Sequence, residues 1–268
     1  MRSPHLRATA RRLLAPALAL ATACSPSTTG SIAGGGGTGT SGTLDKSAFV
    51  TYAHVLMTAT SATSSLGWKA NGVQKASGTA YLGTLSKDTV KFASSSPLVT
   101  FEANNNGGTT RFLSEARLLV DAQRYSAFAF GIVGATNANY VPNLLLAPLD
   151  TLTPAAAKAH VRFAHFMPGV APVDVWTGAP GAEVKVVTAL AYGAISDYVD
   201  ITAAGNAVPS INVIVTPTAV APAGGTNIMS IAGISNIANP FVFTLGLIYT
   251  QSNFSSPSSK SIAIYLER

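Results

Sequence analysis

The sequence predicts an all-β protein in which two tandem antiparallel β-sandwich domains of immunoglobulin-like type follow a disordered tether. The first observation is composition, because only 10% of the 268 residues are charged while 47% are hydrophobic. The second is that short apolar runs are separated by Gly, Pro or Asn, as in sandwich and barrel proteins. The third is a repeated phrase, "FVTYAHVL" from Phe49 and "HVRFAHFM" from His160.

The first expected element is a lipoprotein signal peptide over residues 1–23. A basic first half precedes an apolar run from Leu13 to Ala21 and then small residues, which is the layout of a secretory signal. "LATAC" resembles the bacterial lipobox, in which cleavage leaves the cysteine as the lipidated first residue, although Ala21 stands where Leu is usual. Cys24 is the only cysteine, so we expect it to carry a lipid anchor. The alternative is an ordinary cleaved signal that leaves a free thiol.

Residues 24–45 are expected to form the lipidated cysteine and a flexible tether. The segment "SPSTTGSIAGGGGTGTSGTLD" is rich in Gly, Ser and Thr, so it cannot bury enough apolar surface to offset its backbone entropy. The run from Gly34 to Gly37 lacks the Lys and the preceding strand of a phosphate loop. We therefore expect coil.

The formal net charge of +6 is concentrated at the amino terminus. Arg2, Arg7, Arg11 and Arg12 all precede Cys24, which leaves 13 basic and 11 acidic residues in the rest of the chain. No basic cluster survives there. We expect no nucleic-acid partner, because such binding needs a concentrated positive surface.

An internal repeat divides the remaining chain into a first sandwich over residues 46–152 and a second over residues 158–268. "AFVTYAH" aligns with "AHVRFAH", which places His54 against His165. Further matches follow in the same order: Trp68 with Trp176, Gly83 with Gly193, "NNGGTT" from Asn105 with "PAGGTN" from Pro222, and Gly131 with Gly246. Five ordered matches indicate two copies of one domain of ordinary size.

Each copy is expected to hold about seven short strands. In "VRFAHFM", Val161, Phe163 and His165 share one face while Arg162 and Ala164 share the other, the period of a half-buried strand. The same alternation occurs in "TFEAN" from Thr100, "INVIVTP" from Ile211, "FVFTLGLIY" from Phe241 and "SIAIYLE" from Ser261. The joining segment "LDTLTPAAAKA" is short, so we expect the two copies to touch.

Three phrases of the second copy point to a known family. They are "VRFAHFMPGVAPVDVWTG" from Val161, "YGAISDYVDITAAG" from Tyr192 and the terminal "SIAIYLER", which together span nearly all of residues 159–268. These phrases resemble the bacterial domain of unknown function 4397. In the first copy "SSLGWK" stands where that family has a Pro-Val-Asp phrase, so this copy is assigned by internal similarity alone. The resemblance implies a secreted or surface-attached β-sandwich, commonly in tandem copies and without an established activity.

His54 and His165 are the sharpest candidates for chemistry, because they recur at one position and histidine can act as a general base or a metal ligand. Each shares its strand face with apolar residues, which favours a structural histidine hydrogen-bonded to loop backbone. His160 lies five residues from His165, so the two rings point to opposite faces and cannot bind one ion. We expect no metal site and no cofactor.

Asp174 could bind a calcium ion, but its neighbours supply few oxygen ligands, which favours a role in fixing a loop. Trp68 and Trp176 could form a surface on which sugars stack. Their apparent recurrence at one position favours core packing instead. The chain has no "GxSxG" phrase, so nucleophilic catalysis has no positive support.

These patterns predict a non-catalytic surface lipoprotein of the bacterial cell envelope, anchored in the outer membrane or at the cell surface. Its two sandwiches would serve adhesion, envelope structure or ligand binding, and its partners would be the membrane and an extracellular or periplasmic protein or glycan. The alternative is an enzyme that processes an envelope carbohydrate or peptide at a site around His165 and Asp174. Fold alone cannot decide between the two.

Overall fold

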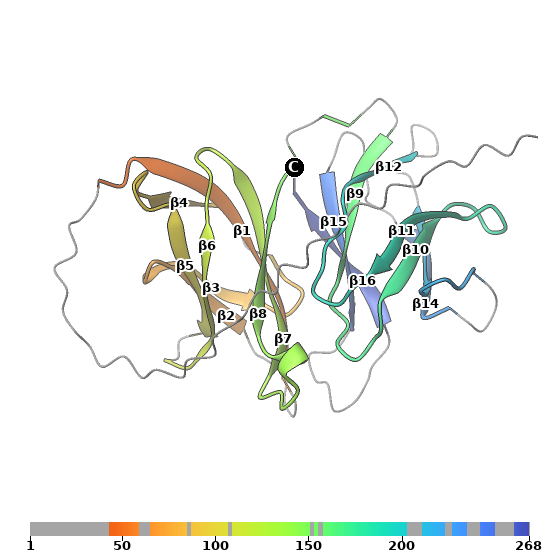
Figure 1. The fold of residues 1–268 in the computed structure, drawn as a ribbon, viewed down its shortest axis with the longest axis horizontal. Coiled ribbons are helices and arrows are strands. Elements are labelled where there is room, and N and C mark those ends of the chain that lie inside the picture. The colour runs from red at the N-terminus through yellow and green to blue at the C-terminus, as the bar shows by residue number, and fades with distance from the viewer. Residues whose placement is uncertain are drawn as a thin grey trace, which may run out of the picture. The chain divides into compact units, whose positions relative to one another are not determined.

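The computed structural model describes residues 43–58, 65–84, 87–106, 109–150, 153–154, 158–202, 211–222, 227–234, 242–249 and 260–267. Nearly all of this chain is β-structure, which confirms the predicted all-β tandem fold (Figure 1). The expected signal peptide, Cys24 and most of the expected tether lie outside the described residues.

Each copy contains eight strands. The first copy comprises β1 (Lys46–Thr58), β2 (Ser65–Ala70), β3 (Val73–Ala80), β4 (Asp88–Phe92), β5 (Leu98–Asn105), β6 (Arg111–Leu118), β7 (Arg124–Val133), the short 3-10 helix η1 (Ala138–Tyr140) and β8 (Asn143–Pro148). The second copy comprises β9 (Lys158–His165), β10 (Val173–Thr177), β11 (Val184–Leu190), β12 (Val199–Thr202), β13 (Ile211–Pro217), β14 (Met229–Ile234), β15 (Val242–Tyr249) and β16 (Lys260–Leu266).

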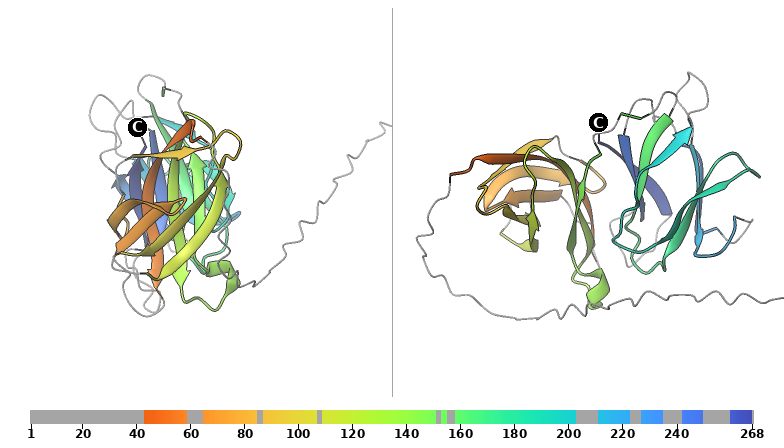
Figure 2. Two further views of the ribbon diagram at one scale, coloured as in Figure 1. Left: turned by 90° about the vertical axis from the view of Figure 1, so that its left-hand side faces the viewer. Right: turned by 45° about the horizontal axis from the view of Figure 1, so that its top comes forward.

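The strands of each copy form two four-stranded sheets in the same order. In the first copy the orders are β4-β1-β7-β8 and β3-β2-β5-β6, and in the second they are β12-β9-β15-β16 and β11-β10-β13-β14. Figure 2 shows these sheets from two further directions. Every described strand of one copy thus has a counterpart in the other, so the internal repeat extends to the strand topology.

Most neighbouring strands are antiparallel, as predicted, but β1 pairs with β7 and β9 pairs with β15 in parallel. Each parallel pair joins the first strand of a copy to its seventh, and the strands of the opposite sheet lie between them in the chain. Parallel neighbours need a long crossover, which this excursion supplies. The sheets are therefore mixed, and the expectation of wholly antiparallel sheets needs this correction.

The histidine match is preserved in space, but a neighbouring match shifts by one residue. The amide of Leu82 donates to the carbonyl of His54 at 2.8 Å, and the amide of Gly193 donates to the carbonyl of His165 at 2.8 Å. Leu82 and Gly193 both have positive φ, 62° and 75°. Gly193 therefore corresponds to Leu82 and not to Gly83, because the turn geometry sets the register here.

The tryptophan match is also wrong by one residue. Trp68 belongs to the core of the first copy and Val175 to the core of the second. Register shifts flank both residues in their strands. Val175 is thus the counterpart of Trp68, while Trp176 points to the outer face of its sheet, because successive strand residues face opposite sides.

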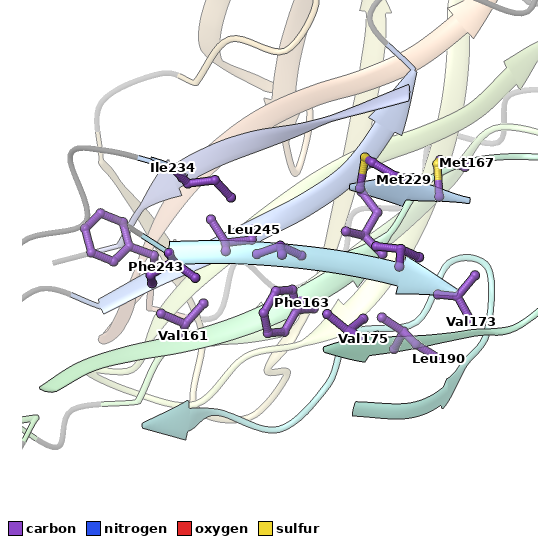
Figure 3. Packing of buried hydrophobic residues seen from close by; sticks show 14 of the residues in the cluster. Val161, Phe163, Met167, Val173, Val175, Leu190, Met229, Ile234, Phe243 and Leu245 are labelled. Atoms are coloured by element: carbon purple, nitrogen blue, oxygen red, sulfur yellow. The ribbon is translucent and has the colours of Figure 1, made fainter. Parts of the chain in front are cut away.

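Each copy has its own apolar core between its two sheets. In the first, the Tyr52 and Trp68 rings lie 5.0 Å apart between β1 and β2. In the second, Phe163, Val175 and Leu245 come from β9, β10 and β15 and pack together (Figure 3). These inward residues follow the predicted period of two.

A third apolar cluster joins the two copies, which touch as expected. Its buried members are Ala53, Val55, Phe128 and Phe130 from the first copy and Ala164, Phe166, Ile248 and Tyr265 from the second. The ring of Phe128 lies 5.3 Å from that of Phe166 and 5.2 Å from that of Tyr265. Strands β1 and β7 are therefore buried on both faces over much of their length, unlike the half-buried strands that alternation predicts.

This interface explains a third shift in the repeat. Ala53 faces Phe128 across the parallel pair, and its counterpart Ala164 faces Gly246, so Gly246 corresponds to Phe128 and not to Gly131. A Cβ at Gly246 would lie 2.9 Å from the Tyr265 ring. A large side chain on one copy and none on the other let the two sheets pack closely.

Candidate functional site

The two recurrent histidines occupy equivalent positions near or at the ends of the described first strands of their copies. Both side chains are buried, with no exposed surface. Nδ1 of His54 accepts a hydrogen bond from the amide of Leu56 at 3.1 Å, and Nδ1 of His165 accepts one from the amide of Met167 at 3.2 Å. The ring of each histidine is thus fixed by the backbone two residues further on.

The electrostatics of the two histidines also match. Burial lowers the pKa of His54 to about 4 and that of His165 to about 4, with the backbone of Ala171 and Val170 opposing the shift in His165. Because Nδ1 accepts a hydrogen bond, the proton of the neutral ring sits on Nε2. Among the described residues, that atom of His54 has no hydrogen-bond partner. Both rings are therefore neutral near neutral pH.

An aromatic ring packs edge-on against each histidine. The ring centroids of His54 and Tyr81 are 5.6 Å apart with an interplanar angle of 84°, and those of His165 and Tyr192 are 6.0 Å apart at 89°. Each tyrosine comes from the turn that exchanges backbone hydrogen bonds with its histidine. This arrangement holds a turn against a strand and leaves the imidazole without contact to solvent.

Asp174 fixes two backbone segments of the second copy. Its side chain is fully buried and accepts hydrogen bonds from Lys185 Nζ at 2.6 Å, from the amide of Ala189 at 2.8 Å and from the amide of Ala219 at 3.0 Å. Burial alone would raise the pKa of Asp174, but these three donors outweigh it and hold the pKa below its ordinary value. The counterpart in the first copy is Gly67, which can make none of these contacts.

The two tryptophans lie in different environments. Trp68 is fully buried, and its indole N–H has no partner. Trp176 is half-buried, its N–H donates to Thr216 Oγ1 at 3.0 Å, and the ammonium of Lys185 lies 4.8 Å from its ring centroid. Trp68 is a core residue, whereas Trp176 lies on the outer face of its sheet, on the same side as Asp174. The core-packing interpretation is therefore wrong for Trp176.

Metal ligands and membrane spans can be assessed only within the described ranges. There, no group of three or more His, Cys, Asp or Glu side chains is placed to hold a metal ion. None of the helices in those ranges is long and apolar enough to cross a membrane. Cys24 lies outside these residues, so its expected lipidation stays a prediction.

A buried polar network between the two copies was missed by sequence analysis. Glu267, after the last strand, accepts hydrogen bonds from Arg162 Nη2 at 2.5 Å, Thr244 Oγ1 at 2.6 Å, Tyr198 Oη at 2.5 Å and Ser126 Oγ at 3.0 Å. The side chains of Arg162 and Glu267 are only 4% and 1% exposed. Ser126 belongs to the first copy and the other members to the second, so the network joins the copies.

Arg162 completes the network. Its Nη1 donates to the carbonyl of Pro148 at the end of the first copy at 2.8 Å, and its Nε donates to Thr244 Oγ1 at 2.9 Å. A lone Arg in an alternating strand looks like an outward-facing residue in sequence. Only the packing of a second sheet over that face makes it a buried charge that needs a partner.

His160 lies on the strand face opposite to His165, as predicted. Its two ring nitrogens face Asp200 Oδ1 at 2.7 Å and Asp150 Oδ2 at 3.2 Å, and its ring stacks on Tyr198 with centroids 4.7 Å apart. Beside this group a pocket of about 530 Å³ is open to solvent. Asp150 and Tyr198 are among the residues that line the pocket, so its wall contains a carboxylate and an aromatic ring.

Comparisons with known proteins place the chain only weakly. No protein-family profile matches it, and no curated protein matches it either. A solved family 41 carbohydrate-binding module from streptococcal virulence factors, described as recognising alpha-glucan, is 13% identical, with 81% of this chain and 96% of that chain covered and a TM-score of 0.26. A family 26 module from Eubacterium rectale, in complex with maltoheptaose, is 10% identical over 82% and 96%, with a TM-score of 0.21. Likenesses this weak say nothing about a ligand of this chain.

Proposed function

We propose that the protein is a non-catalytic lipoprotein of the bacterial cell envelope that presents two β-sandwiches for adhesion, envelope structure or ligand binding. The proposal rests on one observation: the polar residues that stand out in the sequence form hydrogen bonds that stabilise the fold. His54 and His165 are neutral and buried, and both oxygens of Asp174 hold backbone segments together. A group that performs acid–base chemistry must reach its substrate, and these side chains do not reach solvent.

Lipidation of Cys24 supplies the membrane partner of this proposal. The "LATAC" phrase and the Gly-rich segment after it support an anchor followed by a spacer, and β1 begins soon afterwards at Lys46. A cysteine that carries several acyl chains would hold the chain stably at a bilayer. The anchor would lie in the outer membrane or at the cell surface.

The junction supports presentation of the two copies as one body. Ser126 of the first copy donates to Glu267 of the second, and Arg162 of the second donates to the carbonyl of Pro148. The ring of Phe128 also packs against two rings of the second copy. A locked pair offers its ligand two surfaces at a fixed spacing, which reduces the entropy lost on binding. The loop residues 169–172 and the pocket of about 530 Å³ beside His160 are the surfaces on which we expect an envelope protein or glycan to bind.

The alternative, an enzyme for envelope carbohydrates or peptides, gains no support from His165 and Asp174. Each makes its own set of contacts, and among the described residues no hydrogen bond joins the two. Catalysis at His165 would require the turn that carries Tyr192 to open.

The test compares the purified wild-type chain with the His165→Asn variant, with His160→Asn as a control. Each is incubated with isolated peptidoglycan and with envelope membranes, and both bound protein and released fragments are measured. We expect saturable binding without fragments, and binding that His165→Asn leaves unchanged as long as the variant stays folded. Efficient hydrolysis that disappears in folded His165→Asn but not in His160→Asn would overturn the proposal.

A further inference from the structure

One end of the first copy exposes an unusual number of large apolar side chains. Of the eight such side chains in the described residues that are exposed, five lie at this end, each between 51% and 66% exposed. They are Leu44, Val73, Leu98, Leu118 and Val120. Isolated exposed apolar residues are ordinary, but a group of them at one end indicates a contact surface. We call this group the apolar tip.

Strand register places the tip at the end where the chain enters the first copy. Strand β1 begins there at Lys46, which is paired with Phe92 at the end of β4. In the second sheet, Leu98 at the start of β5 lies opposite Leu118 at the end of β6. Loops at the starts of β1, β5 and β7 therefore share one end of the sandwich.

Hydrogen bonds hold the loops of the tip together. The amide of Leu119 donates to the carbonyl of Pro97 at 3.0 Å, and the amide of Val120 donates to Tyr125 Oη at 3.0 Å. The amide of Ser47 donates to Asp121 Oδ1 at 3.0 Å. The loop that carries Leu118 and Val120 is thus held in a hydrogen-bonded frame.

The charges beside the tip are arranged so that they partly cancel. Lys46 Nζ lies 3.0 Å from Asp121 Oδ2, and this pair is solvent-exposed. Asp45 accepts a hydrogen bond from the amide of Ser94 at 2.8 Å. Exposed apolar side chains of this size suit the interfacial region of a bilayer, where binding grows with the apolar area that leaves water.

We propose that the apolar tip contacts the lipid bilayer in which the chain is anchored, so that the first copy stands on the membrane. The inference rests on the proposed lipid anchor at Cys24. This residue precedes Gly42, near the start of the first copy, by 18 residues. A covalent chain of that length keeps the start of the first copy within about 60 Å of the anchor, whatever its conformation. The tip is the part of the described chain that such a segment keeps nearest to the bilayer. It adds a second, reversible contact that fixes orientation.

The first test uses residues 43–268 without any lipid, since they contain both sandwich cores and form a compact unit. Flotation with vesicles of phosphatidylethanolamine and phosphatidylglycerol measures the partition of the wild type. The combined Leu118→Ser and Val120→Ser substitutions are expected to lower it about tenfold, because apolar area leaves the interface. Val184→Ser is the matched control, since Val184 is 64% exposed in the second copy and Val120 is 62% exposed.

The second test uses the acylated chain in the same vesicles, where the anchor raises the local concentration of the tip. Brominated lipid should quench the emission of a Val120→Trp variant more than that of Val184→Trp. Equal quenching of the two, or equal flotation of the tip and control variants, overturns the inference. So does self-association of residues 43–268 that the tip substitutions abolish, because the tip would then bind a second copy.

The experiments distinguish a wrong assignment of the lipid anchor at Cys24 from a wrong assignment of membrane contact to the apolar tip. An unacylated Cys24 together with tip-dependent flotation refutes the anchor and supports the tip. An acylated Cys24 with no difference between Val120→Trp and Val184→Trp supports the anchor and overturns the tip.

Discussion

The buried histidines predict that the protein loses stability in mild acid. Burial lowers the pKa of His54 to about 4 and of His165 to about 4, whereas the unfolded chain should titrate near 6.5. The unfolded state therefore binds more protons between these two values. The stabilising contribution of the neutral rings is complete above about pH 6.5 and is lost as the pH falls toward 4.

The size of this effect follows from the shift. A depression of about 2.5 pKa units corresponds to about 3 kcal/mol of unfolding free energy for each histidine when the loss is complete. Between pH 7 and pH 5 the expected loss is about 2 kcal/mol for each ring, or roughly 4 kcal/mol for both. Most carboxylates titrate below this window, so they contribute little to the change.

Urea unfolding followed by far-ultraviolet circular dichroism at pH 7, 6 and 5 measures the loss directly. The His54→Asn and His165→Asn double variant keeps an acceptor near the position of Nδ1 but cannot titrate, so its stability should change little over the same range. His160→Asn serves as the control and should retain the acid-induced loss. The reasoning is refuted if the double variant and the wild type lose the same free energy.

Four further substitutions test the packing. Glu267→Ala leaves the guanidinium of Arg162 buried without its partner, so calorimetry should show a loss of about 3–5 kcal/mol, and a loss below 1 kcal/mol would contradict the role assigned to the network. Trp68→Ala should lower the free energy of unfolding in urea by about 3–5 kcal/mol, because Trp68 is fully buried. Trp176→Ala should lower it by about half as much or less, because Trp176 is half-buried. Equal losses would argue that both are core residues. Asp174→Ala leaves the backbone amides of Ala189 and Ala219 without their acceptor and should cost about 1–3 kcal/mol, with faster hydrogen exchange in the segments that it holds. Unchanged exchange there would contradict the loop-fixing role.

The period-two pattern and the repeated phrase were sufficient to predict the tandem all-β fold. Their success has a physical basis, since one face of each strand must enter the core of its own copy, as Phe163 and Val175 do. Register was harder to predict. Identical residues such as Gly83 and Gly193 suggested one alignment, but the positive φ of Leu82 and Gly193 sets another. Backbone conformation can be preserved where residue type is not.

The candidate site was predicted only in part. The sequence suggested a structural role for His54 and His165, because each shares a face with core residues, and the structure places both rings in buried backbone contacts. It gave no sign of the partnership between Arg162 and Glu267, which are 105 residues apart. The pair forms across one sheet of the second copy, and the first copy that packs over it makes it a buried pair.

The measurement that tests the central claim most directly is mass spectrometry of the amino-terminal peptide of the protein isolated from bacterial membranes. The account predicts a peptide that begins at Cys24, with a diacylglyceryl group on the sulfur and residues 1–23 removed. A mature peptide with an unmodified Cys24 thiol, or one that begins at another residue, would contradict the lipoprotein assignment.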